Sequence, residues 1–461
     1  MMNLEGIKIE GRQLIKPKLL FWDSNVYRNP YGILVYGPKV KPETKNIEIW
    51  AVEEQLTREE RDYGISKMVD LLTNDLGKEI PFKDRNFSSF YRISGVNFPI
   101  VRNRTVSLKN LTNELSKLTS GMVLIIHKGK VRSDIYEDSK LQAKISGVRI
   151  QYFDISHLVP VMYHHIFGLF TQMIAKANGT PWIIENSPYN KFQERQSIII
   201  GIAFTTKWSK INYGIAHFLN IKNLKQVMEV RRIKGRTDDS RGLFLQREEM
   251  TEILTAAIDW HSTDNNKNDP LDIYLYKTTP LHVEERRAIE DFLANQTAEN
   301  QLIRVAHIHI KSSNPKNRVY DTDSVGPKST LHYMPKQGQV VEIISTDNIR
   351  ESNSLSLIGQ CMVSTTGIPD ISGGRDPIGT PNPFTMEIHA NWKVSLPLIE
   401  NQVMAMSSAD WEATGKQYQS LFILKYANKL ASYLSRWSSD KEKNSSTESL
   451  LPRTWDIRDL M

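Results

Sequence analysis

Four polar side chains in the first half of the chain have the chemistry of an anion-binding site. Tyr136 and Lys140 lie four positions apart in a segment with a helical pattern, so they share one helix face. Gln151 opens the next apolar run, and Lys176 closes a second helical segment. Hydroxyl, amide and ammonium groups all donate hydrogen bonds, and we interpret the four as a site for the terminal phosphate of a nucleic-acid strand.

Each of these residues also has an ordinary explanation. The spacing Tyr-x-x-x-Lys is common on helices, and a lysine near a helix C-terminus such as Lys176 is favoured by the helix dipole alone. The spacing by itself therefore leaves the phosphate site as one hypothesis among several.

The surrounding pattern predicts how these residues are positioned. The apolar run Met122–Ile126 is typical of a buried strand, and Ser133 or Asp134 can cap a helix that runs to about Ile145. A strand at 148–153, a helix at about 157–177 and a short strand at 182–184 follow. This alternation predicts a parallel sheet, whose ligands bind beyond the carboxyl ends of the strands. We therefore expect the four side chains at that end of the sheet.

The N-terminal third contains weaker signals. Turn residues flank the apolar stretch Gly32–Tyr36, which we interpret as a strand of an entry hairpin. We further predict a strand at 47–52 and helices at 57–76 and 105–118, the last from its regular leucine spacing.

From residue 196 the pattern changes. Three successive strands, at 197–204, 211–219 and 227–233, predict an antiparallel meander, and alternating helices and strands follow to residue 311. A meander followed by alternation is the arrangement of a ribonuclease H-like domain. The remaining elements that we predict are helices at 246–260 and 282–294, strands at 272–277, 303–311, 332–334, 339–345, 356–363 and 384–392, and a C-terminal helix at 416–437.

The last residues differ in composition from the body of the chain. Residues 438–449 are rich in Ser, Lys and Glu, so we predict a mobile tail from 438 to 461. Apolar and aromatic residues return at Leu450–Trp455, and this end either docks on the same chain or meets a partner.

Composition narrows the functional classes. The 461 residues suffice for about two or three domains. A net charge of +7 and a pI near 9.1 permit a polyanionic partner without requiring one. The single cysteine, Cys361, excludes an internal disulfide framework and a Cys-based zinc site, and it favours a reducing compartment. We see no secretory signal and no apolar run long enough to cross a membrane, so we expect a cytoplasmic protein.

Taken together, the parallel-sheet unit and the ribonuclease H-like unit resemble the MID and PIWI halves of an Argonaute protein. Four motifs support the resemblance: Gly32–Pro38, Lys176–Trp182, Gly379–Pro383 and Tyr426-Ala427-Asn428, where many relatives have Tyr-Ala-His. The resemblance implies an α/β fold, with a hairpin and a Rossmann-like MID domain at 1–184 and a PIWI domain at 185–437. The guide pocket begins after only about 130 residues, so this is the layout of a short prokaryotic member, most similar to archaeal ones.

The resemblance also assigns roles to particular residues. It implies that Tyr136, Lys140, Gln151 and Lys176 bind the 5′ phosphate of a guide strand. In relatives the terminal carboxylate helps to ligate a cation beside that phosphate, so Met461 would hold a Mg²⁺ there if the tail folds back.

A basic run could follow the guide backbone. It comprises Arg231, Arg232, Lys234 and Arg236, and a solvated strand end explains it equally well.

The resemblance predicts a protein without nuclease activity. Two-metal cleavage needs several carboxylates, and at the positions where active relatives carry them this chain has Ala203, Thr278 and Asn428. One alternative is an active nuclease that uses other acids, such as Asp272 or Glu248. Another is a Rossmann-type enzyme that acts on a small phosphorylated substrate.

The implied function is recognition rather than cutting. Such a protein would bind a guide RNA or DNA, pair it with a complementary invading DNA and signal to a separate effector protein that supplies the missing N-terminal lobe. The process is defence against viruses or plasmids, and an effector could recruit the complex to a membrane without insertion of this chain.

Overall fold

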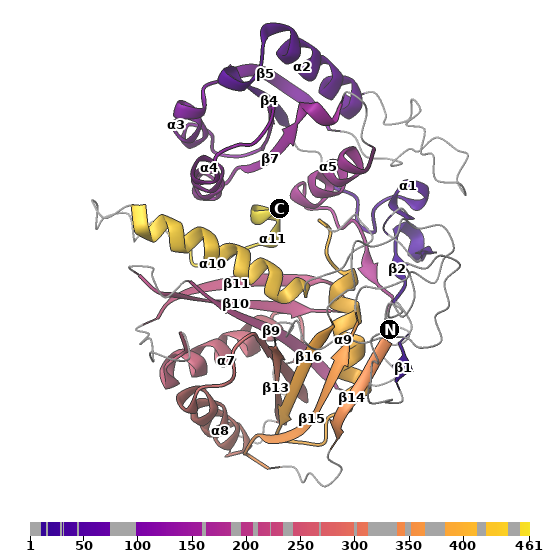
Figure 1. Ribbon diagram of the computed structural model, residues 1–461, viewed down its shortest axis with the longest axis vertical. Helices are drawn as coiled ribbons and strands as arrows, with labels where there is room; N and C mark the ends of the chain where they lie inside the picture. The colour runs from indigo at the N-terminus through magenta and orange to yellow at the C-terminus, as the bar shows by residue number, and fades with distance from the viewer. Residues whose placement is uncertain are drawn as a thin grey trace, which may run out of the picture.

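The computed structural model contains two sheet-based units, one above the other in Figure 1. The upper unit is built on a four-stranded sheet, the lower unit on a ten-stranded sheet, and a third sheet of three short strands lies beside them. The residues that the structure describes are 11–14, 17–27, 30, 32–43, 46–73, 98–158, 163–185, 195–205, 211–221, 223–233, 243–266, 269–298, 302–311, 339–345, 352–364, 383–412, 421–440 and 452–461.

All strands of the four-stranded sheet are parallel. In spatial order they are β5 (Ile100–Val106), β4 (Ile47–Val52), β6 (Met122–His127) and β7 (Arg149–Asp154). One face packs against α2 (Arg58–Thr73) and α5 (Tyr163–Lys176), and the other against α3 (Leu111–Ser116) and α4 (Ser133–Ile145). Helices on both faces explain why β6 is apolar along its whole length.

Two predictions for this region are wrong, the sheet to which the strand at 182–184 belongs and the strand at 32–36. Ile183–Ile184 (β8) does not join the parallel sheet, because it pairs antiparallel with β2 (Leu19–Leu20), which also pairs with β3 (Val26–Tyr27). Gly32–Tyr36 forms a short helix, α1, whose end is closed when the Gly37 amide donates to the Ile33 carbonyl (2.8 Å). A short apolar run has no periodicity that separates a strand from a buried helix.

The region predicted as one helix at 105–118 is also divided differently. Strand β5 continues to Val106, and only a 3₁₀ turn at 108–110 and the short α3 follow it.

The ten-stranded sheet confirms the ribonuclease H-like arrangement. Strands β9 (Gln196–Phe204), β10 (Tyr213–Asn220) and β11 (Lys225–Arg232) form the predicted meander. Strands β12 (Leu271–Lys277) and β13 (Ile303–Lys311) run parallel to β9. Beyond β13 the sheet continues with β16 (Phe384–Ala390), β15 (Ser356–Val363), β14 (Gln339–Ser345) and β1 (Arg12–Gln13). The strand predicted at 332–334 lies outside the described residues.

Helices cover both faces of this sheet. The helices α7 (Arg247–Ser262) and α8 (Val283–Ala298) pack on one face, and α9 (Leu396–Ser408) and α10 (Phe422–Asp440) pack on the other. We did not predict α9. It is buried nearly all round, so it lacks the polar face that makes a helix recognisable in a sequence.

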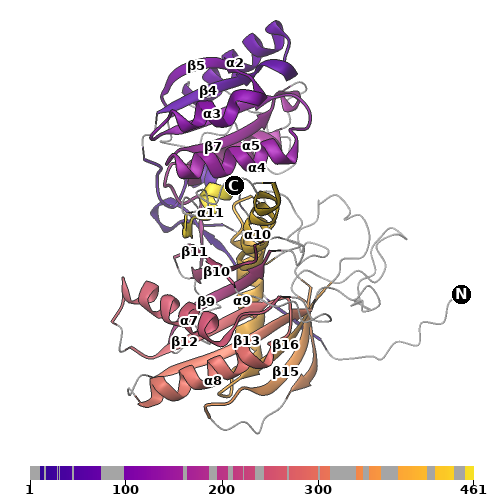
Figure 2. The ribbon, with the colours of Figure 1, turned by 90° about the vertical axis from the view of Figure 1, so that its left-hand side faces the viewer.

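The C-terminal end docks on the body of the chain. Thr454–Trp455 (β17) pairs with β11, and Trp455, Ile457 and Leu460 are buried. The helix α11 (Ile457–Leu460) lies between α4 and α5 above and β11 and α10 below (Figure 2). The prediction of a mobile tail from 438 is therefore wrong for 438–440, which belong to α10, and for 452–461, which the buried Trp455 anchors. Residues 441–451 lie outside the described residues.

The structure also describes the surroundings of Cys361 and the length of the apolar helices. Cys361 is buried in β15, and burial raises the pKa of its thiol. Among the helices that the structure describes, none is long and apolar enough to cross a bilayer.

Candidate functional site

The structure brings Tyr136, Lys140, Gln151 and Lys176 together beside β7. Tyr136 lies in the first turn of α4 and Lys140 one turn later, while Lys176 is the last residue of α5. Gln151 is the third residue of β7.

The ammonium groups of Lys140 and Lys176 converge on the same acceptors, and we call these two residues the lysine pair. Lys140 Nζ donates to the Ile150 carbonyl at 3.0 Å, and Lys176 Nζ donates to the same oxygen at 2.5 Å. Both also donate to the backbone oxygen of Met461, at 2.7 Å in the case of Lys176. Lys176 further donates to Gln151 Oε1 at 2.6 Å. Three elements of the upper unit, α4, β7 and α5, thus meet the distant Met461 at one point.

The electrostatics of the lysine pair favour an anionic ligand. Lys176 is completely buried and Lys140 is 2% exposed. Burial, followed by the positive charge of Lys140, lowers the pKa of Lys176 well below its usual range. The acceptors at Ile150 and Gln151 are neutral carbonyl and amide oxygens, so a phosphate would stabilise two ammonium groups that are costly to bury.

Aromatic rings form one wall beside the lysine pair. The ring of Tyr136 lies 4.9 Å from that of Tyr152 and 6.3 Å from that of Tyr433 on α10, centroid to centroid. Lys140 Nζ lies 5.5 Å from the Tyr136 ring centroid. The site is therefore built from both units, with α10 of the lower one facing α4 of the upper one.

The site lies along an edge of the sheet rather than beyond its carboxyl ends, so the predicted location is wrong. Strand β7 is the last strand, and Ile150 is its second residue. Because no strand of this sheet lies beyond β7, the Ile150 carbonyl is available to the lysine pair. An edge of this kind cannot be identified from the order of elements along the chain.

A polar network on the lower unit adjoins the lysine pair and was not predicted. Glu412 accepts hydrogen bonds from Lys429 and Lys425 on α10, each at 2.9 Å. Burial alone would raise the pKa of Glu412, but these two ammonium groups lower it to about 2. The charges of Lys429 and Glu412 both act on Lys176. Lys425, Lys429 and Tyr433 recur every four residues, and this spacing was the available signal in the sequence.

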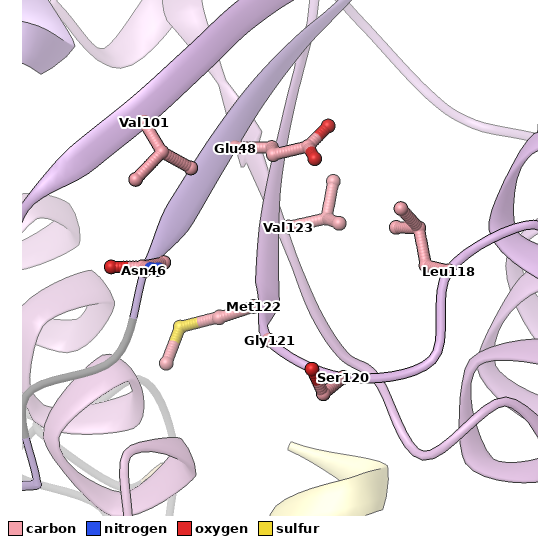
Figure 3. A pocket seen from close by; sticks show the side chains of 8 residues that line it. All are labelled: Asn46, Glu48, Val101, Leu118, Ser120, Gly121, Met122 and Val123. Atoms are coloured by element: carbon pink, nitrogen blue, oxygen red, sulfur yellow. The ribbon is translucent and has the colours of Figure 1, made fainter.

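A separate recess opens at the amino ends of β4, β5 and β6 (Figure 3). Its volume is about 380 Å³, and its lining combines apolar side chains with the carboxylate of Glu48. That carboxylate accepts a hydrogen bond from Trp50 Nε1 at 2.8 Å and lies 3.8 Å from Arg104 Nε. A carboxylate in the lining disfavours an anion, so this recess does not compete with the lysine pair as a phosphate site.

The predicted basic run is only partly described. Arg231 is 11% exposed in its side chain and pairs with Glu229 (2.9 Å) and with Glu252. Arg232 is exposed at the end of β11. Lys234 and Arg236 lie outside the described residues. The two glutamates balance the charge of Arg231, so it is a poor candidate for a phosphate contact.

Two of the three positions of the expected catalytic acids, Ala203 and Thr278, lie at the carboxyl ends of the central strands, and Asn428 lies on α10. Lys277, the last residue of β12, pairs in register with Ile202, so Thr278 and Ala203 follow side by side. Ala203 is buried, whereas Thr278 and Asn428 are exposed. No group of three or more His, Cys, Asp or Glu side chains within the described ranges is placed to hold a metal ion.

The acids considered for the alternative nuclease, Asp272 and Glu248, do not lie at the carboxyl ends of β9 and β12. Asp272 is the second residue of β12, near the opposite end from Thr278, and it lies 3.4 Å from Arg195 Nε. Glu248 is exposed in the first turn of α7.

The lysine pair also bears on the predicted Mg²⁺. The Met461 oxygen accepts from both ammonium groups, so a cation on that oxygen would face two positive charges. The Mg²⁺ at Met461 stays a prediction.

Comparison with known proteins identifies the fold. No protein-family model and no curated protein sequence matches the chain. Among solved structures, that of Clostridium butyricum Argonaute bound to a guide DNA with a 5′ deoxycytidine and a 19-mer target DNA superimposes with a TM-score of 0.64. This chain has the fold of an Argonaute.

The match covers 92% of this chain and 52% of the Clostridium butyricum Argonaute chain, at 14% sequence identity. The chain thus spans about half the length of that Argonaute. The Argonaute-like fold accounts for both sheet units, and it agrees with the predicted succession of a MID-like and a PIWI-like half.

Proposed function

We propose that this protein binds the 5′ phosphate of a guide strand at the lysine pair and presents that strand for pairing with a complementary nucleic acid. The observation that carries the proposal is the convergence of Lys140 and Lys176 on one buried point within an Argonaute-like fold. The Clostridium butyricum Argonaute was solved with guide and target DNA, which supports the same class of ligand for this chain.

The chemistry of each site residue suits this role. The lysine pair neutralises the phosphate, and Gln151 orients Lys176 through its amide oxygen. Tyr136 offers a hydroxyl and a ring face beside the phosphate. The Met461 oxygen occupies the donors of the lysine pair until the phosphate arrives.

The test compares oligonucleotides that differ only in the 5′ group. Lys140→Met and Lys176→Met should each weaken binding of a 5′-phosphorylated strand by at least about tenfold, which is on the order of the 1.5–3 kcal/mol of a hydrogen bond to a charged group. Binding of the 5′-hydroxyl strand should change little. Lys109→Ala, which removes an exposed lysine at a distance from the site, is the matched control. Equal losses of affinity for both strands would mean that Lys140 and Lys176 contact the nucleic-acid backbone in general rather than the 5′ phosphate.

We further propose that the protein recognises its target without cutting it, because Ala203, Thr278 and Asn428 supply no carboxylate for a metal ion. Incubation with a loaded guide, a matched target and Mg²⁺ or Mn²⁺ should yield no cleavage product. Efficient cutting that Asp272→Asn abolishes would instead establish the nuclease alternative.

A protein that recognises a target without cutting it needs a second protein to act once the target is bound. We propose that an effector protein joins the complex and supplies the part of the Argonaute architecture that this sequence does not match, in defence against invading nucleic acid. The chain spans only about half of the Argonaute that it resembles, which supports this arrangement. Co-expression with candidate neighbouring proteins and purification of a stoichiometric complex provides the test, and an effector active without guide and target would argue against the proposed signalling.

A further inference from the structure

An exposed tryptophan with two lysines lies beside the two sheet units, and we call Trp22, Lys39 and Lys41 the Trp22 patch. Trp22 belongs to a 3₁₀ turn between β2 and β3, and it is 45% exposed. The other tryptophans whose side chains the structure describes are buried or half-buried. A large apolar ring that is left in solvent loses the free energy of burial, so its exposure calls for an explanation.

The turn holds Trp22 in place. Asp23 and Ser24 both adopt left-handed backbone conformations, with φ of 53° and 59°. Asn25 closes the turn, because its side-chain amide donates to the Trp22 carbonyl at 2.8 Å and its carbonyl accepts from the Phe21 amide at 2.9 Å. Two successive non-glycine residues in this region are unfavourable, and such strain is found where a local conformation serves a ligand or a packing contact.

Positive charge accompanies the ring. Lys41 Nζ lies 4.7 Å from the centroid of the Trp22 ring, and Lys39 Nζ donates to Ser24 Oγ at 3.3 Å. An exposed ring beside ammonium groups is the combination with which proteins bind single-stranded nucleic acid, since bases stack on the ring and phosphates contact the cations.

The Trp22 patch is connected to the lysine pair through a short segment. Thr180 follows Lys176 by four residues, which span at most about 14 Å of extended chain. Val40, between the two lysines of the patch, pairs with Thr180, and the Lys39 amide donates to the Pro181 carbonyl at 3.1 Å. The patch is therefore on the order of 20 Å from Lys176, within the span of the roughly 4–16 nucleotides that single-strand sites cover.

We propose that the Trp22 patch is a second contact for a nucleic-acid strand whose 5′ phosphate is held by the lysine pair. A base of the strand stacks on Trp22, and neighbouring phosphates contact Lys39 and Lys41. This inference rests on the proposed function. A protein partner is the alternative occupant, but a surface for an apolar partner has no need of two ammonium groups beside the ring.

The experiment uses the full chain and 5′-phosphorylated strands of 2 and about 16 nucleotides, with binding followed by fluorescence anisotropy. Trp22→Ala should weaken binding of the long strand by about five- to tenfold, the low end of the effect of losing one base stack. It should leave the dinucleotide unchanged, because that ligand cannot reach the patch. Trp22→Phe should retain most of the affinity, and Val26→Ala, which alters an exposed apolar residue of the neighbouring β3, is the control.

A strand with one abasic position distinguishes stacking from charge. A set of strands is compared that differ only in which position lacks its base. At one position the missing base should weaken binding by the unaltered protein, and the same strand should bind to Trp22→Ala no more weakly than the complete strand does. Unchanged affinity of Trp22→Ala for the long strand would overturn the proposal and favour a protein partner. An equal loss for the dinucleotide would overturn it too, since the substitution would then be disturbing the lysine pair.

The outcome also separates this inference from the proposed function. If the unaltered protein binds 5′-phosphate and 5′-hydroxyl strands equally, the guide-end proposal fails. The Trp22 patch must even then show the dependence on strand length and on the abasic position.

Discussion

Lys176 shows how a single residue acquires a property that its type does not carry. Its ammonium group is buried against Lys140, so its pKa is lowered well below the usual range. As pH rises, Lys176 therefore loses its proton before an exposed lysine does, and the attraction for phosphate weakens. At low pH the second phosphate pKa, near 6, limits binding instead.

We therefore expect the affinity for a 5′-phosphorylated strand to have an optimum in pH. It should fall below about pH 6 as the phosphate gains a proton. It should also fall at alkaline pH well before exposed lysines titrate, and Lys176→Met should remove this alkaline decline. Anisotropy titrations across pH, with a 5′-hydroxyl strand as the control, provide the measurement. An alkaline decline that persists in Lys176→Met would assign it to another group.

His307 is a second residue whose environment decides its effect. It is 2% exposed, and neither of its ring nitrogens has a hydrogen-bond partner among the described residues. Burial, and then the charge of Lys277, lower its pKa well below 6.5. The unfolded chain therefore takes up a proton at this position at a higher pH than the folded chain does, and stability is lost as pH falls below about 6.5.

His307→Leu should leave stability at pH 7 unchanged or raise it by about 1 kcal/mol, because it removes two unpaired polar atoms. The loss of stability from pH 7 to pH 5 should become smaller. His217 is the matched contrast, since its nitrogens lie 3.0 Å from the Ile423 carbonyl and 2.8 Å from Gln226 Oε1. His217→Leu should cost about 1–3 kcal/mol. Thermal unfolding at both pH values tests the pair, and a destabilised His307→Leu would contradict the interpretation.

At the scale of elements, the C-terminal segment holds the site together. Strand β17 extends the ten-stranded sheet, and α11 places the Met461 oxygen on the lysine pair. Lys144 on α4 pairs with Asp459 at 2.8 Å, and Asp459 also caps α11 through the Asp456 amide. One short segment thus links β11 of the lower unit to α4 of the upper unit.

Trp455→Ala should therefore affect stability and binding together. Trp455 is 2% exposed and donates through Nε1 to the Pro452 carbonyl at 2.9 Å, so its loss should cost about 3–5 kcal/mol locally. Undocking of α11 should also alter the affinity for a 5′-phosphorylated strand. Arg453→Ala, an exposed change in the same segment, is the control. Unfolding temperature and anisotropy are measured on the same samples, and unchanged affinity would mean that the lysine pair does not depend on α11.

At the scale of the molecule, contacts between the two units surround the candidate site. Arg436 on α10 pairs with Glu137 on α4 at 2.5 Å, and Tyr433 packs against Tyr136 one turn earlier on α10. A phosphate at the lysine pair would thus be held where the upper and lower units meet. Ligand binding at such a point stabilises both units at once.

We expect a 5′-phosphorylated strand at about 100 times its Kd to stabilise the protein by about 2.7 kcal/mol, seen as an upward shift of the unfolding transition. The 5′-hydroxyl strand at the same concentration should shift it less. A chelator should leave the shift unchanged, because the two ammonium groups of the lysine pair neutralise the phosphate without a metal ion. If EDTA abolishes the shift, the result would support the predicted Mg²⁺ ion beside the 5′ phosphate. Differential scanning calorimetry measures these differences.

Much of the architecture could be predicted from local pattern. The continuous apolar run of β6 indicated a strand buried on both faces, and the meander of β9, β10 and β11 followed by alternation indicated a ribonuclease H-like unit. Strand β13 has the predicted bounds. These signals are reliable because a polar side chain on a strand that is buried on both faces would rarely find a hydrogen-bond partner, so such strands are almost entirely apolar.

The residue types and order of Tyr136, Lys140, Gln151 and Lys176 were likewise sufficient to propose an anion site. The almost entirely buried helix α9 and the short α1 were not predictable, because neither has a polar face to set its period. Only the tertiary structure placed the site on the free edge of β7, added the α10 network and brought Met461 onto the lysine pair. The local sequence pattern indicates which side chains must be buried and which must have a hydrogen-bond or ion-pair partner. Which distant segment supplies that partner depends on the packing of the whole chain.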